Sequence, residues 1–238
     1  MDKDLVFLKE CTNEQLQVLS DLLVYKPNGH RRTSVSLSST RNYDLYYPNE
    51  MHLLLEDVTN ELLLQGGNKV RNFLRGGKGV SYHKLLIDIC NKQKVNFNPH
   101  NTVEQLEKYL LQKTIETAIE DMTEEDVHQI SSELSKKDLS NIVSSGFRLT
   151  SPIILKTTTM VMAQILRKLG LKIVAGALGR FIGTRLFSIL TGPVGWVLGG
   201  LWTAYDLLGP SYKVTVPCVM TIAYFRATIN LTEESFNE

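Results

Sequence analysis

Glycines and basic residues crowd together between residues 66 and 79, a composition suited to holding an anion. The stretch has five glycines, and its cations are Lys69, Arg71, Arg75 and Lys78. Exposed backbone N–H groups and a helix N-terminus favour negative charge. A nucleotide-binding P-loop is excluded, because Gly79 follows Lys78 where Ser or Thr is required. Two interpretations stay open: a short helix over 68–75 between glycine joints, or a loop that binds phosphate, lipid headgroups or nucleic acid.

Histidine and carboxylate spacing does not indicate a metal site. Glu125 and His128 have the Glu-x-x-His spacing of di-iron bundles, but such a site needs a second copy and further carboxylates. His52 and Glu56 lie one helical turn apart and lack further ligands at recognised spacings. We therefore expect solvated helix faces at both pairs, and neither a metal nor another cofactor.

Nucleophile motifs are also missing from the sequence. The three cysteines, Cys11, Cys90 and Cys218, are far apart and form no Cys-x-x-Cys pair. This usage argues against a disulfide scaffold and favours a reducing compartment. No serine stands in a Gly-x-Ser-x-Gly elbow. We expect a protein without enzymatic activity.

Composition bounds the class of protein. The 238 residues include 26 basic and 25 acidic side chains, and 43% are apolar. A chain of this size forms one large domain or two small ones, and its composition excludes wholesale disorder. A net charge of +1 gives no general attraction to nucleic acid. The first apolar cluster is interrupted by Lys9 and Glu10, so we expect no export signal and a cytoplasmic location.

The elements that must position these residues are helical. Capping boxes at Thr12 and Thr102, and apolar residues spaced by three and four, predict an all-α multi-helix bundle. The predicted helices cover the first 25 residues as a hairpin, then 49–65, a stretch after Gly79, 102–119, 123–142 and a helix from 152. Residues 30–48 are polar and are expected to form an exposed loop. One strand-like alternation, 212–216, competes with the helical signals.

The chain changes character near residue 150. Residues 1–152 carry a net charge of −3, whereas residues 153–229 carry +7 and are more apolar. Nine of the sixteen glycines fall between 170 and 209. We therefore divide the chain into a polar N-terminal helical region, 1–150, and an apolar, basic, glycine-rich C-terminal region, 151–238, packed as one architecture.

Residues 186–205 form the most distinctive part of the C-terminal region. They contain no charged side chain, and about 20 apolar residues suffice to span a bilayer. A Gly-Pro pair interrupts the run and favours a hairpin of two helices, about 173–190 and 194–208. The small residues expected to pack helices or form the turn are Gly179, Gly183, Gly192, Pro193, Gly195 and Gly199. The cations expected to contact lipid headgroups are Arg167, Lys168, Lys172, Arg180 and Arg185.

Three patterns along the chain also point to a family. They are Asp4-Leu5-x-Phe7-Leu8-x-x-Cys11-x-x-Glu14-x-Leu16; Gly66-Gly67 with Leu74-Arg75-Gly76-Gly77-Lys78-Gly79-Val80-x-Tyr82 and Leu86-x-Asp88; and Gly192-Pro193-Val194-Gly195 with Tyr212-x-Val214-Thr215-Val216-Pro217. In this order they resemble the N-terminal, central and C-terminal segments of the YaaW-like family of largely uncharacterised bacterial proteins. Some members carry a name that links them to a ubiquinol–cytochrome c chaperone. The resemblance covers nearly the whole chain and implies no catalytic residue.

These observations predict a non-enzymatic cytoplasmic protein whose C-terminal hairpin engages or inserts into an anionic membrane, as a stress or defence effector would. Burial of the hairpin at the centre of a soluble bundle is the simpler alternative. A second alternative is an adaptor or chaperone-like module that binds a protein partner through the 30–48 loop and the N-terminal hairpin. Homo-oligomer formation stays open, and nucleic acid is the least favoured partner.

Overall fold

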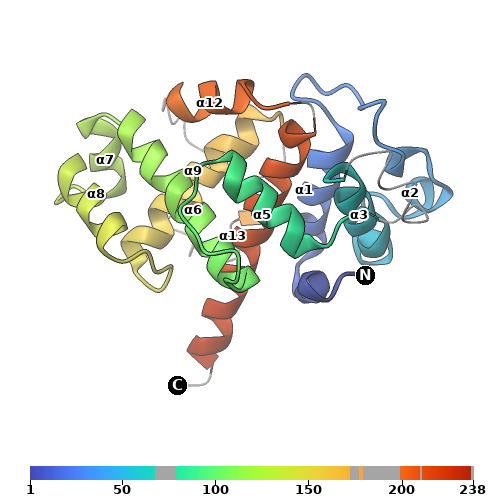
Figure 1. Cartoon of the computed structure of the whole chain (residues 1–238), viewed down its shortest axis with the longest axis horizontal. Coiled ribbons are helices and arrows are strands. Elements are labelled where there is room, and N and C mark those ends of the chain that lie inside the picture. The colour runs from blue at the N-terminus through green and yellow to red at the C-terminus, as the bar shows by residue number, and fades with distance from the viewer. Residues whose placement is uncertain (68–78, 172–176, 179–198, 210, 237–238) are drawn as a thin grey trace.

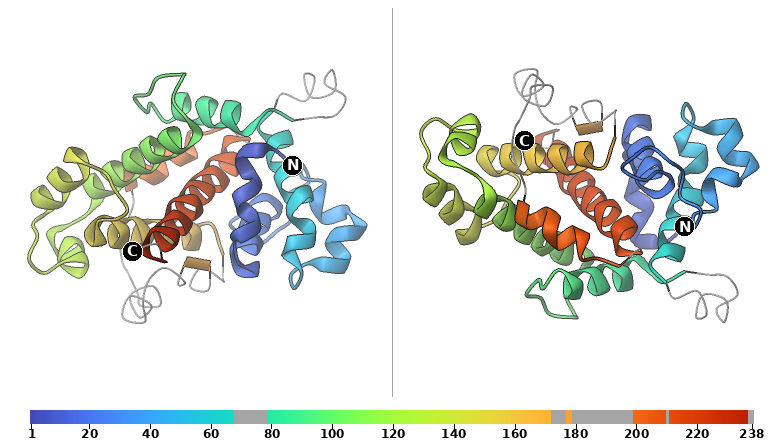
Figure 2. Two further views of the ribbon diagram at one scale, coloured as in Figure 1. Left: turned by 90° about the horizontal axis from the view of Figure 1, so that it is seen from below. Right: turned by 90° about the horizontal axis from the view of Figure 1, so that it is seen from above.

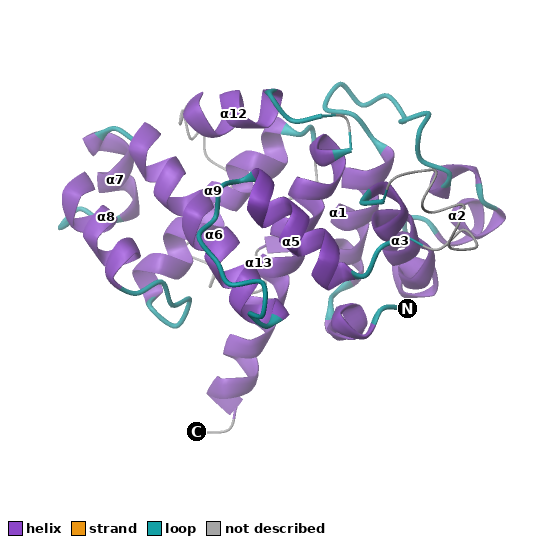
Figure 3. Ribbon diagram, viewed as in Figure 1, coloured by secondary structure: helices purple, strands orange, loops and turns teal. Residues whose placement is uncertain are grey.

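The computed structural model describes residues 1–67, 79–171, 177–178, 199–209 and 211–236. In these ranges every regular element is a helix, and the only extended pairing is one isolated bridge between Tyr25 and Arg31 (Figure 3). The prediction of an all-α multi-helix fold is confirmed.

The first helix after residue 12 begins where its capping signal predicts. A 3₁₀ helix, η1 (Lys3–Glu10), is followed by α1 (Asn13–Val24), whose capping box joins Thr12 and Gln15. Helix α3 (Met51–Gln65) packs on both of them. Asn13 ties the start of α3 to α1, because its side chain bonds the carbonyl of Pro48 at 2.7 Å and the N–H of Met51 at 2.8 Å.

The prediction of an exposed loop over 30–48 is wrong. The segment contains η2 (Leu37–Ser39) and α2 (Arg41–Tyr46), and it buries Val35, Leu37 and Tyr43 in the core. Polar residues mislead here because they bond to α3: Ser36 donates to Glu61 through its backbone N–H at 3.2 Å and through its hydroxyl at 2.7 Å. Few apolar side chains at irregular spacing are enough to anchor the segment.

The central helices are α5 (Tyr82–Lys92) and α6 (Val103–Asp121), and Thr102 provides the predicted capping box of α6. A single helix over 123–142 is a wrong prediction. The structure has two, α7 (Glu124–Ile130) and α8 (Lys136–Ser145), each opened by its own capping box. The second box joins Ser135 and Asp138. It satisfies the free N–H groups at the start of α8, so a new helix begins there and α7 does not continue.

Helix α9 (Pro152–Lys168) begins with proline in the first turn, as predicted. Just beyond its end lies Gly170, whose φ of +83° favours glycine and where a Cβ would lie 2.5 Å from the Pro27 carbonyl oxygen. After the undescribed part of the chain come α12 (Gly199–Asp206) and α13 (Tyr212–Phe236).

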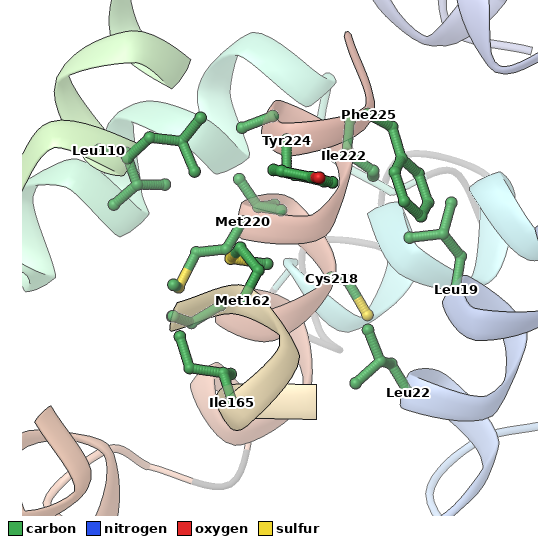
Figure 4. Packing of buried hydrophobic residues seen from close by; sticks show 14 of the residues in the cluster. Leu19, Leu22, Leu110, Met162, Ile165, Cys218, Met220, Ile222, Tyr224 and Phe225 are labelled. Atoms are coloured by element: carbon green, nitrogen blue, oxygen red, sulfur yellow. The ribbon is translucent and has the colours of Figure 1, made fainter. Parts of the chain in front are cut away.

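Helix α13 lies at the centre of the helical packing. It contacts α1, α3, α5, α6, α9 and η1, and in Figure 2 it runs between α9 and α1. Figure 4 shows Met220, Ile222 and Phe225 of this helix among side chains of α1, α6 and α9. Residues 212–216, the strand-like alternation that competes with the helical signals, form its beginning, as the all-α prediction requires. Val214, Thr215 and Val216 are all buried there, so the polar and apolar positions of the alternation do not separate into an exposed and a buried face.

Among the described helices, α13 is the one that meets the length and hydropathy expected of a membrane span, over Tyr212–Leu231. About 78% of the most apolar part of this stretch is buried inside the protein. The buried core helix of a folded protein meets the same length and hydropathy criteria, so this signal is weak evidence for a membrane.

Candidate functional site

A pocket of about 310 Å³ lies between α6, α13 and the turn that joins α8 to α9. Its apolar wall contains Leu111 of α6, and Phe147 and Leu149 of the turn. Ala223 and Ala227 of α13 complete this wall. Because alanine side chains are short, the two helices leave a hollow beside them that larger residues would fill.

An ion pair that is almost fully buried also lines the pocket. Nε of Arg226 donates to Oε2 of Glu107 at 2.7 Å, and the two side chains are only 11% and 3% exposed. The Tyr82 hydroxyl donates to Oε1 of Glu107 at 2.7 Å. Arg226 also bonds the backbone carbonyl of Asp4, and its guanidinium lies 3.9 Å from the centre of the Phe7 ring. The cluster thus joins η1, α5, α6 and α13.

Burial dominates the titration of this cluster. Desolvation raises the pKa of Glu107, and the charge and hydrogen bond of Arg226 oppose that shift. Desolvation and the neighbouring Glu107 raise the pKa of Tyr82 well above its ordinary value. The carboxylate oxygens accept from Arg226 and Tyr82, and the guanidinium donates to Glu107 and to the Asp4 carbonyl, an arrangement suited to holding four segments together.

The mouth of the pocket is positively charged. Lys108 and Arg148 are exposed there, and neither forms an ion pair with a residue in the described ranges. Glu104 also lies at the mouth, but hydrogen bonds from its own backbone N–H and from Thr102 lower its pKa and tie its charge to the start of α6. The arrangement therefore favours an anion with an apolar part.

A second feature is the attachment of α12 to the outside of the molecule. Helix α12 packs on α6 at the upper edge of the view in Figure 1. Oδ2 of Asp121, at the end of α6, accepts from the N–H of Gly200 at 2.8 Å. At the other end of α12, the Tyr205 hydroxyl donates to the carbonyl of Lys213 at 2.7 Å.

The second of these bonds compensates for a proline. Pro217 lies inside α13 and has no N–H to donate to the carbonyl four residues earlier, which belongs to Lys213. The Tyr205 hydroxyl takes that place, and the Lys213 ammonium lies 5.8 Å from the centre of the Tyr205 ring. Helix α12 therefore supplies a hydrogen bond that the first turn of α13 lacks.

Three of the residues predicted from the sequence for membrane contact are described. Gly199 opens α12, whereas Arg167 and Lys168 end α9, and α13 separates the two helices in the right view of Figure 2. The remaining predicted residues lie outside the described ranges: Lys69, Arg71, Arg75, Lys78, Lys172, Gly179, Arg180, Gly183, Arg185, Gly192, Pro193 and Gly195. Within the described ranges, no group of His, Cys, Asp or Glu side chains is placed to hold a metal.

Sequence reasoning missed the Glu107–Arg226 pair, although a signal was present. Spacings of three and four place Glu107 on the same helix face as Leu110 and Leu111. Arg226 is the only charged residue between 214 and 231. A lone charge on an apolar face indicates a buried partner. Which charge pairs with which, 119 residues apart, is decided by the tertiary structure.

Comparison with known proteins places the chain in a family. A domain of unknown function, DUF3944, matches residues 1–33. A UPF0174 protein of Helicobacter pylori strain J99 is 32% identical over 100% of this chain and 94% of its own length. The UPF0174 protein YaaW of Escherichia coli K12 is 26% identical over 98% of this chain and 97% of its own length. No solved structure matches. Similarity at this level over the whole length shows that the chain belongs to the UPF0174 family, as its resemblance to YaaW-like proteins predicted.

Proposed function

We propose that this is a non-enzymatic cytoplasmic protein that engages an anionic membrane through its C-terminal charge-free segment, residues 186–205. The observation that carries the proposal is the position of α12, which contains the end of that segment. It lies on the outside of the molecule, and Leu207, directly after it, is 79% exposed. A surface helix can leave the body without opening the core.

Helix α13 does not have this freedom. It is apolar enough for a membrane, but its side chains fill the centre of the protein, and its release would expose the whole core. We therefore assign membrane contact to the segment that ends in α12, held by Asp121 and Tyr205, and we assign α13 to the folded body.

The proposed mechanism is a population shift between a docked and a released form of this segment. Cations make the first contact with anionic headgroups, and Arg167, Lys168, Lys172, Arg180 and Arg185 are the candidates. Apolar insertion follows, and the small faces at Gly179/Gly183 and Gly195/Gly199 then let helices approach closely. Gly192 and Pro193 provide the turn of the hairpin in this proposal.

The test is flotation of the full chain with phosphatidylglycerol vesicles and, for comparison, phosphatidylcholine vesicles. Asp121→Ala and Tyr205→Phe each remove one contact of α12, so both should float more than the wild type, and the gain should resist high salt. Asp44→Ala removes an exposed carboxylate of α2 and should behave as the wild type does. If neither α12 variant floats at neutral or mildly acidic pH, the proposal is wrong.

A second candidate function, an adaptor, is favoured by exposed leucines near the N-terminus. Leu45 of α2 is 60% exposed and Leu53 of α3 is 56% exposed. The two helices are linked by Asn42, whose amide donates to Asp57 at 3.0 Å. We propose that these leucines are the contact surface if the protein acts as an adaptor. Retention of a cellular protein by the wild type, and its loss with Leu45→Ser/Leu53→Ser but not Asp44→Ala, would favour this function.

A further inference from the structure

We propose that the pocket between α6, α13 and the turn over 146–150 binds a small amphipathic carboxylate, with its apolar part inside and its carboxylate at the mouth. This role is separate from the membrane contact, since the pocket and α12 share none of their lining or attachment residues. The lining residues on which the proposal rests all lie in the described ranges.

The apolar part of the ligand is recognised by the inner wall. Phe147 and Leu149 are buried by the rest of the chain, so their positions are fixed before a ligand arrives. Leu111 faces them from α6, and the methyl groups of Ala223 and Ala227 line the α13 side. A preformed apolar wall with a few polar groups is the usual construction of a small-molecule site.

The charge at the mouth selects an anion. Glu107 neutralises Arg226, and Glu104 is tied to the start of α6. Lys108 and Arg148 are left as the two cations that face the opening without an anionic partner in the described ranges. A carboxylate there would gain charge-assisted hydrogen bonds from one or both. A cationic ligand would meet repulsion from the same two residues.

The size of the pocket limits the ligand. A volume of about 310 Å³ gives room for about ten non-hydrogen atoms, if each takes roughly the 30 Å³ of a water molecule in the liquid. A carboxylate with a tail of about seven further carbons fits this limit, and octanoate is a suitable probe. A ligand of this size binds weakly in most sites, with an expected Kd of about 0.1–1 mM.

The experiment is a titration of the full-length protein with sodium octanoate, followed by two-dimensional amide NMR. Octanamide, which has the same tail but no charge, should bind at least tenfold more weakly, and acetate, which has the charge but no tail, should not bind. Shifts should centre on residues 104–111, 147–150 and 223–227. Absence of octanoate binding up to 10 mM, or equal binding of octanamide, would overturn the proposal.

Variants separate the two parts of the site. Lys108→Glu/Arg148→Glu should weaken octanoate binding at least tenfold, and Ala227→Leu, which fills the pocket, should abolish it. The matched control is Arg41→Glu/Lys137→Glu, which changes the net charge equally at exposed positions on α2 and α8 and should bind as the wild type does. Equal loss in the control would mean a general charge effect and would contradict the assignment. Ala227→Leu, which leaves the net charge unchanged, should not alter vesicle flotation, so the two proposals fail independently.

Discussion

Burial raises the pKa of two carboxyl groups, those of Asp21 and Glu107. Asp21 lies on α1 and accepts a hydrogen bond from the Tyr47 hydroxyl at 2.9 Å. Burial raises its pKa from 3.8 to about 6, although the Tyr47 hydrogen bond lowers it. Because the pKa is higher in the folded protein than in the unfolded chain, the folded form holds the proton more tightly. This carboxyl therefore makes the protein less stable as the pH rises from 3.8 to 6, and the loss persists above pH 6.

Asp21→Asn should remove that loss, because the amide oxygen still accepts from Tyr47 and carries no charge. We expect the free energy of unfolding at pH 7.5 to rise by about 1–3 kcal/mol, since each pKa unit corresponds to ~1.4 kcal/mol. The gain should shrink toward pH 4, where the wild-type carboxyl is protonated in the folded state. Urea unfolding at both pH values measures it, with exposed Asp44→Asn as the control. Equal stability of Asp21→Asn and wild type at pH 7.5 would contradict the burial argument.

The Glu107–Arg226 pair makes a different prediction, because each charge depends on the other. Arg226→Met or Glu107→Leu alone leaves a charge buried without its partner and should cost about 3–5 kcal/mol. The combined variant Tyr82→Phe/Glu107→Leu/Arg226→Met leaves no such charge and should lose less than either single variant. Urea unfolding of the set measures this. A combined loss equal to the sum of the single losses would show that the groups act separately.

At the scale of elements, α12 and α13 are linked by a hydrogen bond that replaces one missing at Pro217. The proline removes one N–H from the helix, and the Tyr205 hydroxyl bonds the Lys213 carbonyl instead. Two helices that are close in sequence thereby hold each other in place, and the outer helix gains an attachment that does not require a large apolar face.

Tyr205→Phe should destabilise the protein by about 1–2 kcal/mol, because it removes the hydroxyl that bonds this carbonyl. The cost should be smaller in a Pro217→Ala background, since the alanine N–H can donate to the same carbonyl within the helix. A double-mutant cycle by urea unfolding tests the coupling between positions 205 and 217. Additive effects would mean that the tyrosine hydroxyl does not replace the missing backbone bond.

At the scale of the whole molecule, the structure combines a fixed centre with a helix attached to its edge. Helix α13 is surrounded by α1, α3, α5, α6 and α9, whereas α12 lies on α6 with Leu207 exposed beside it. Regions with fewer buried contacts open locally at lower free energy than the core. We therefore expect α12, the described end of the segment that the proposed function requires to move, to open without global unfolding.

Hydrogen exchange should reveal this difference. In the wild type, amides over 199–206 should exchange faster than amides over 214–225, which lie in the buried part of α13. Asp121→Ala should accelerate exchange in 199–206 and leave 214–225 unchanged, as measured by mass spectrometry of peptides. Equal acceleration in both segments would mean that α12 and the core open together.

The sequence by itself determined the helices whose signals are local. Thr12 and Thr102 cap their helices through bonds to residues three positions away, and apolar residues spaced by three and four marked the buried faces of α3 and α6. Such bonds act within one turn, so they can be read from neighbouring residues. The family resemblance was likewise carried by short patterns distributed along the chain.

Only the tertiary structure decided what depends on distant partners. Residues 212–216 alternate like a strand in the sequence, but the surrounding helices bury 214–216 at the start of α13. Residues 30–48 resemble a loop, but Ser36 donates to Glu61 of α3 and apolar side chains of the segment enter the core. The pocket exists because Ala227 stands opposite a turn about 80 residues earlier in the chain, at Phe147 and Leu149. Local hydrogen bonds are fixed by spacing along the chain, whereas pairing and packing between helices depend on which side chains the folded chain brings together.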